Sequence, residues 1–121
     1  MSGRIMIAED EPLLAMALGE QLREYGFEVA GVAASVRQAV ALLGEVTCDA
    51  AILDCNLRGE SVEPLATLLQ ERQIPFIFHS GYNGKNVPAK FNDVPFLSKP
   101  VSSEALLSAV RSLLPEHPDG K

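Results

Sequence analysis

Residues 50–56 read AAILDCN, a short apolar run that ends in an acid. The four residues 50–53 show no polar alternation, which is typical of a strand buried on both faces of a parallel sheet. Asp54 ends this strand, and a polar loop follows it through Asn56 and Gly59. The pattern therefore predicts an α/β protein in which a carboxylate emerges at the end of a buried strand.

The alternation of strand and helix continues on both sides of this stretch. The first strand is followed directly by the acids Glu9, Asp10 and Glu11, and Pro12 suits the first turn of a helix. Strands are expected at residues 4–8, 27–33, 50–53, 76–79 and 95–97. Helices are expected at residues 12–25, after an N-cap at Ser35, around Leu65 to Leu69, and after an N-cap at Ser102 or Ser103. Strict alternation predicts an open, mostly parallel sheet with helices on both faces.

Apolar residues at helical spacing mark the side of each helix that we expect to be buried. They are Leu14, Leu18, Leu22 and Tyr25 in the first helix, Val36, Val40, Leu42 and Leu43 in the second, and Leu106, Leu107, Val110, Leu113 and Leu114 in the last. Residues 82–93 contain several Asn together with Gly84 and Pro88, which is poor material for a helix. The fourth crossover is therefore expected to be a helix of about two turns or an irregular segment.

Length and charge limit the classes of protein that the chain can belong to. Its 121 residues, 47% of them hydrophobic, are enough for one domain with a core of its own. We expect a single domain over residues 1–121, with its core at about 3–114 and a flexible tail at 115–121. A net charge of −6 argues against direct binding to nucleic acid, which needs a dense face of Lys and Arg.

Cysteines and apolar runs indicate the compartment. Cys48 and Cys55 have neither the spacing of a disulfide framework nor that of a zinc site, so we expect reduced thiols. No apolar run is long enough to cross a membrane, and the N-terminus lacks the pattern of a signal peptide. The sequence therefore predicts a cytoplasmic protein without a membrane partner.

Polar residues stand where the predicted strands end. They are Glu9 and Asp10 after the first strand, Asp54 after the third, Ser80 after the fourth and Lys99 after the fifth. Because the carboxyl ends of parallel strands meet at one edge of a sheet, these side chains should lie close together. Carboxylates act as covalent nucleophiles, and carboxylate and carbonyl oxygens suit magnesium. The set predicts phosphoryl transfer to a carboxylate beside a divalent cation and a lysine. Without a cation, the like charges of the acids should raise the pKa of at least one carboxyl group.

Four short motifs at these strand ends resemble the receiver domain of two-component response regulators. They are Glu9-Asp10-Glu11-Pro12, Asp54-Cys55-Asn56-Leu57, Ser80-Gly81 and Lys99-Pro100. The resemblance covers essentially the whole chain. It implies a flavodoxin-like (βα)5 fold, doubly wound, with a five-stranded parallel sheet in the order 2-1-3-4-5 and a fourth helix that is short or irregular.

The resemblance implies a role for each residue of the acidic cluster. Asp54 would accept the phosphoryl group from a sensor histidine kinase or a phosphotransfer protein. Glu9, Asp10, Asp54 and the backbone carbonyl of Asn56 would bind Mg²⁺ or Mn²⁺. Glu9 departs from the commoner Asp of the family, and its side chain is one methylene longer.

The resemblance also implies residues that respond to phosphorylation. Ser80 would hydrogen-bond the phosphoryl group, and Lys99 would pair with one of its oxygens. Phe96 stands where the family has a switching Tyr or Phe, although an aromatic residue at this place also suits simple packing on an edge strand. Gly81, Tyr82 and Pro100 would modulate the neighbouring loops.

The stretch FIFHSGY at residues 76–82 resembles a mostly alphaproteobacterial, stand-alone subgroup with a Phe-Ala-Thr-Gly-Tyr type motif. Here His79 and Ser80 replace Ala and Thr. Ser80 keeps the hydroxyl but lacks the β-branch that restricts the rotamers of Thr. Two interpretations of His79 are open: a structural or partly exposed side chain, or a group that senses pH or binds metal.

A small patch on the first helix is a candidate surface for kinase docking. Met16 points roughly opposite to the buried stripe, with Leu13 on its flank and Ala15 and Gly19 next to it. A single exposed apolar residue is ordinary on a protein surface. The resemblance, however, implies that kinase helices dock on this helix.

We expect a single-domain response regulator that switches its contacts with an unknown downstream protein, as a monomer or a weak phosphorylation-dependent dimer. It would be a phosphoacceptor signalling domain, not an enzyme beyond its own phosphoryl transfer and dephosphorylation. A degenerate receiver that binds its partner without phosphorylation is one alternative. An aspartyl-phosphate phosphatase is another, but such enzymes carry a second acid where this chain has Asn56. A dinucleotide carrier would need a Gly-x-Gly-x-x-Gly motif after the first strand.

Overall fold

The computed structural model describes residues 3–81, 87–99 and 101–114, and its centre is a five-stranded parallel sheet. Its strands are β1 (Arg4–Ala8), β2 (Glu28–Ala33), β3 (Ala50–Asp54), β6 (Phe76–Ser80) and β7 (Phe96–Ser98). The order β2-β1-β3-β6-β7 is the expected order 2-1-3-4-5 along the chain, so the flavodoxin-like fold is confirmed. The tail expected at residues 115–121 lies outside the described residues.

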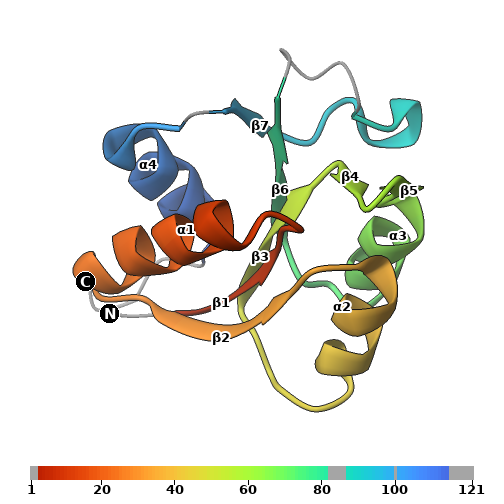
Figure 1. Cartoon of the computed structure of the whole chain (residues 1–121), viewed down its shortest axis with the longest axis horizontal. Helices are drawn as coiled ribbons and strands as arrows, with labels where there is room; N and C mark the ends of the chain where they lie inside the picture. Colours follow the sequence, from red (N-terminus) through yellow and green to blue (C-terminus); the bar gives the residue numbers. More distant parts are fainter. Residues whose placement is uncertain (1–2, 82–86, 100, 115–121) are drawn as a thin grey trace.

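Helices cover both faces of the sheet (Figure 1). One face carries α1 (Pro12–Glu24) and α4 (Ser103–Leu113), and the other carries α2 (Val36–Leu43) and α3 (Glu63–Glu71). Side chains alternate along each strand, so Met6 belongs to the layer under α2 and α3, and Ile7 to the layer under α1 and α4. No helix in the described ranges is long and apolar enough to cross a bilayer.

Serine side chains begin two of these helices, as predicted. Ser35 Oγ accepts a hydrogen bond from the Gln38 amide, and Ser102 Oγ accepts one from the Ala105 amide, both at 3.1 Å. Ser102, rather than Ser103, is therefore the N-cap of α4. Each bond satisfies an amide that would otherwise lack a partner in the first helical turn.

Two residues of the predicted helical stripes are exposed. Val40 is 42% exposed, whereas Ala39 and Leu43 of the same helix are buried. The buried stripe of α2 is centred on the small Ala39, and Val40 lies at its rim. Tyr25 is 39% exposed because it is the C-cap residue, one position beyond the end of α1.

The fourth crossover contains a short 3-10 helix, η1 (Ala89–Phe91), which confirms the expected short or irregular connection. Phe91 is buried and makes edge-to-face contacts with Phe76 and Phe78 of β6, with ring centroids 5.7 and 6.2 Å away. Lys90 Nζ lies 3.3 Å from Thr67 Oγ1 on α3. Aromatic packing thus fixes η1 to the sheet where helical propensity is low.

A hairpin that the sequence did not predict follows β3. Its strands β4 (Asn56–Leu57) and β5 (Glu60–Ser61) pair antiparallel. The turn residues Arg58 and Gly59 have φ angles of 53° and 83°. Two consecutive positive φ angles are those of a type I′ turn. The expected polar loop is therefore an ordered hairpin, and it stands next to the carboxyl end of β3.

Candidate functional site

Strand alternation brings three polar side chains to the same face of the sheet. Each stands two residues after a buried isoleucine, and residues two apart along a strand share a face. The pairs are Ile7 and Glu9, Ile52 and Asp54, and Ile77 and His79. These isoleucines belong to the core layer under α1 and α4. The polar side chains therefore continue that layer at the carboxyl end of the sheet.

Three carboxylates meet at this edge, as the sequence predicted. Glu9, Asp10 and Asp54 each offer an oxygen, and these oxygens all lie within 4.8 Å of one another. Glu9 is 2% exposed and Asp54 is 8% exposed, whereas Asp10 is half-buried. Such a cluster provides the hard oxygen ligands that divalent cations such as Mg²⁺ prefer.

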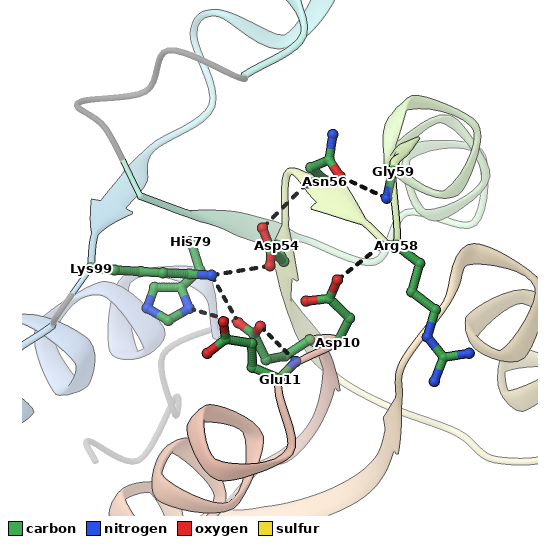
Figure 2. Close-up of polar contacts among 9 residues, drawn as sticks. Asp10, Glu11, Asp54, Asn56, Arg58, Gly59, His79 and Lys99 are labelled. Atoms are coloured by element: carbon green, nitrogen blue, oxygen red, sulfur yellow. Dashed lines mark hydrogen bonds and ion pairs between the residues drawn. The ribbon is translucent and has the colours of Figure 1, made fainter.

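A backbone amide donates a hydrogen bond to each of these carboxylates (Figure 2). The bonds are Glu11 N to Glu9 Oε2 at 3.1 Å, Asn56 N to Asp54 Oδ1 at 3.2 Å, and Arg58 N to Asp10 Oδ2 at 2.9 Å. The Asn56 side chain accepts a bond from Gly59 N at 2.9 Å, which stabilises the turn of the hairpin. The hairpin therefore orients Asp10 and keeps Asn56 next to Asp54.

Lys99 bridges two of the carboxylates from the end of β7. Its Nζ lies 3.0 Å from Asp54 Oδ2 and 3.2 Å from Glu9 Oε1. Partial burial alone would lower the pKa of Lys99, but Asp54 and Glu9 raise it overall. Lys99 is thus a cation at neutral pH and offsets part of the negative charge of the cluster.

The pKa values of Glu9 and Asp54 move in opposite directions. Burial raises the pKa of Asp54, and the charge of Glu9 raises it further, against the effects of Lys99 and the Asn56 amide. Burial also acts to raise the pKa of Glu9, but His79, the Glu11 amide and Lys99 outweigh it and lower the pKa to about 2. The expectation that a cluster without a cation raises at least one carboxyl pKa agrees with the shift at Asp54.

The contact between His79 and Glu9 is the feature of the site that the sequence did not predict. It is 2% exposed, so the interpretation as a partly exposed side chain is wrong. Its Nδ1 lies 3.5 Å from Glu9 Oε1, at the outer limit of a hydrogen bond. A signal was available in the sequence, because His79 stands two residues after Ile77 just as Asp54 stands two residues after Ile52.

The other predicted switch residues lie around the end of β6. Ser80 is buried, and its backbone oxygen accepts a hydrogen bond from Lys99 N at 2.8 Å. Gly81 is exposed, and Phe96 on β7 is 41% exposed. Tyr82 and Pro100 lie outside the described residues.

The predicted docking patch on α1 is only partly at the surface. Leu13 is 77% exposed and Met16 is 58% exposed, but Ala15 and Gly19 are buried. Ala15, Met16 and Gly19 line a groove of about 400 Å³ that also reaches Glu9 and Asp10. The small residues thus form part of the groove wall beside the carboxylates, and Met16 stands at its rim.

Known proteins share this sequence pattern. A family profile described as "Response regulator receiver domain" matches residues 5–111. The chain is 30% identical over 111 residues to "Transcriptional regulatory protein PdtaR" of Mycobacterium tuberculosis, across 88% of this chain and 54% of that protein. The chain spans about half the length of the curated relatives that it matches.

Solved structures share the fold as well. The solution structure of SdrG from Sphingomonas melonis Fr1 is 40% identical, with a TM-score of 0.82, over 91% of this chain and 94% of that chain. The solution structure of the BeF3-activated conformation of SdrG from Pseudomonas melonis Fr1 is 39% identical, with a TM-score of 0.80, over 93% of this chain and 96% of that chain.

Proposed function

The chain belongs to the response regulator receiver domain family, and from this premise we propose that Asp54 accepts a phosphoryl group from a sensor histidine kinase or a phosphotransfer protein. The observation that carries the proposal is the contact between a buried carboxylate and a lysine inside a cluster of three carboxylates. An oxygen of Asp54 forms a bond to phosphorus while the P–N bond of the donor phosphohistidine breaks. The histidine leaves with the electron pair of that bond, and Asp54 becomes an acyl phosphate.

The residues around Asp54 suit the charges of this reaction. A phosphoryl group that approaches a carboxylate meets electrostatic repulsion, and the Lys99 ammonium, 3.0 Å from Asp54 Oδ2, offsets it. Ser80, at the end of the neighbouring strand, would donate its hydroxyl hydrogen to a phosphoryl oxygen. Asn56 N donates to Asp54 Oδ1 and fixes the rotation of the carboxylate.

The same edge of the sheet suits a divalent cation. Glu9, Asp10, Asp54 and the backbone carbonyl of Asn56 would hold Mg²⁺ or Mn²⁺, since hard oxygen donors predominate and three of them already converge. When bound, the cation supplies positive charge to the phosphoryl oxygens. The direction of the Asp54 pKa supports this assignment, because burial and the nearby charge of Glu9 raise that pKa despite Lys99.

The signal would leave the site through the ends of β6 and β7. Lys99 N donates to the backbone oxygen of Ser80, so these two strand ends are tied together. Phe96 stands three residues before Lys99 and is partly exposed, a suitable place for a side chain that changes its contacts. The 39% identical SdrG has a BeF3-activated conformation, and BeF3⁻ has the charge and shape of a phosphoryl group, which supports a switch of this kind. The downstream partner would be a protein that reads this face.

Kinase docking would use the exposed apolar residues of α1. Leu13 and Met16 are large and exposed, and Met16 lines the groove that reaches Glu9 and Asp10. We place the reaction in the cytoplasm, where Cys48 and Cys55, both free, would remain reduced. Met16→Glu should slow transfer from a kinase but not from acetyl phosphate, whereas Val40→Glu, which changes another exposed apolar residue on α2, should slow neither.

The central test is intact-mass spectrometry after incubation with acetyl phosphate, with and without Mg²⁺. We expect one phosphoryl adduct that needs Mg²⁺, is absent in Asp54→Asn, and persists in the control Asp93→Asn, which changes an exposed acid outside the cluster. An adduct that persists in Asp54→Asn would refute the assignment. No adduct from acetyl phosphate or from a phosphohistidine donor would indicate a receiver that binds its partner without phosphorylation.

A further inference from the structure

His79 is a buried titratable side chain to which the phosphoryl transfer assigns no role. Its side chain is 3% exposed, and neither Nδ1 nor Nε2 has a well-aligned hydrogen-bond partner among the described residues. Its Nδ1 lies 3.5 Å from Glu9 Oε1. A buried imidazole without a partner loses the hydration of its polar atoms, so a side chain kept only for packing would better be apolar. The burial of His79 therefore needs a reason other than packing, and Glu9 is a charged group within reach of its imidazole.

Glu9 needs more positioning than a shorter acid would. A glutamate has one more rotatable bond than an aspartate, so its carboxylate must be fixed by more contacts to stay in one place. Glu9 Oε2 is fixed by the Glu11 amide at 3.1 Å. Glu9 Oε1 is also buried without a well-aligned hydrogen bond, although Lys99 Nζ lies 3.2 Å away. The Oε1 atom is thus the less well held of the two, and it is the atom that faces His79.

His79 stands apart from the carboxylate oxygens that converge. In Figure 2, His79 and Asp10 lie on opposite sides of Asp54. Glu9, Asp10 and Asp54 converge within 4.8 Å, and that set does not include the imidazole. The imidazole therefore lies outside the converging set, where it can hold a ligand of the cation without being one.

We propose that His79 is a positioning residue, whose Nδ1–H donates to Glu9 Oε1 and fixes the longer carboxylate for the binding of a divalent cation. The proposal rests on the proposed function, because it concerns the same cluster. It predicts that Glu9 and His79 act as a pair. Hydrogen-bond partners of metal ligands typically change metal affinity by roughly 10- to 100-fold.

The test compares two amide variants that place a donor at different ring positions. Asn Nδ2 is as many bonds from the backbone as His Nδ1, whereas Gln Nε2 matches His Nε2. We expect His79→Asn to bind Mg²⁺ within about twofold of the wild type, and His79→Gln and His79→Leu to bind it roughly tenfold more weakly. The readout is the Mg²⁺ dissociation constant from amide chemical shifts without a phosphodonor, with thermal unfolding in EDTA to report packing separately. Wild-type affinity in His79→Gln, or equal weakening in His79→Asn and His79→Gln, would overturn the proposal.

If His79→Leu does not fold, a substitution of His79 in the Glu9→Asp variant still tests the proposed pair. In Glu9→Asp the shorter carboxylate no longer reaches the imidazole, so His79→Gln should change the Mg²⁺ affinity less than about twofold there. A tenfold loss in both backgrounds would mean that His79 acts on the site without Glu9, and would refute the pairing. Because no phosphodonor is present, failure of Asp54 to become phosphorylated would leave this result intact and would count only against the proposed function.

Discussion

Replacement of Phe91 tests whether aromatic packing, rather than helical propensity, fixes the fourth crossover to the sheet. Phe91 is 1% exposed, and its ring lies edge-to-face with Phe76 and Phe78 at centroid distances of 5.7 and 6.2 Å. Removal of a buried Phe ring costs about 3–5 kcal/mol where the cavity cannot collapse. Neighbouring Phe rings belong to a strand buried along its whole length, so little collapse is expected. We predict a loss of about 3–5 kcal/mol in the free energy of unfolding of Phe91→Ala.

The assay is equilibrium unfolding in urea, followed by far-UV circular dichroism. The matched control is Phe96→Ala, which removes a ring that is 41% exposed and should cost less than about 1 kcal/mol. Hydrogen exchange of the Val94 amide, which donates to the Phe91 carbonyl at 3.0 Å, reports whether the crossover opens on its own. A loss below about 1 kcal/mol in Phe91→Ala would refute the reasoning, because it would mean that the crossover contributes little to the cooperative fold.

Three further predictions concern stability. Ser102→Ala should lower the free energy of unfolding by about 0.5–2 kcal/mol in urea titrations, since the Ala105 amide loses its cap, and an unchanged value would contradict the capping role. Asp54→Asn should raise the urea midpoint of unfolding at neutral pH, because burial and Glu9 raise the pKa of Asp54 and so disfavour its charged form. A lower midpoint would show that the ion pair between Asp54 and Lys99 outweighs these two effects. The pKa of Glu9 is lowered from 4.5 to about 2, so its carboxylate stabilises the fold above about pH 4.5 and loses this effect as pH falls toward 2. The free energy of unfolding of Glu9→Gln should therefore fall less steeply than that of the wild type between these two pH values.

The sequence predicted which polar side chains lie together because the geometry of a parallel sheet is simple. An apolar run followed by an acid marks the carboxyl end of a strand, and all such ends lie at one edge. Glu9, Asp10, Asp54 and Lys99 were therefore placed together without knowledge of any distance, and they lie together in the structure.

Other features depend on relations that a single sequence does not contain. The contact of His79 with Glu9 joins β6 to the end of β1, and β3 lies between these strands, so it depends on two successive registers. The hairpin depends on Arg58 at a φ of 53°, a conformation that the residue type does not reveal. Val40 was misplaced because two neighbouring positions of α2 fit the same apolar stripe, and packing selected Ala39.

Under the proposed function, the contacts of Lys99 would serve both chemistry and signalling. Through Asp54 and Glu9 its ammonium joins the ends of β3 and β1, and through its amide its backbone is tied to Ser80 at the end of β6. A phosphoryl group on Asp54 would add a larger, more negative group to a carboxylate oxygen near this ammonium. Lys99 would then move with the new charge, and its backbone would carry the ends of β6 and β7 with it. Phe96 is three residues away on β7, so under the proposed function this lysine would link Asp54 to an exposed aromatic side chain.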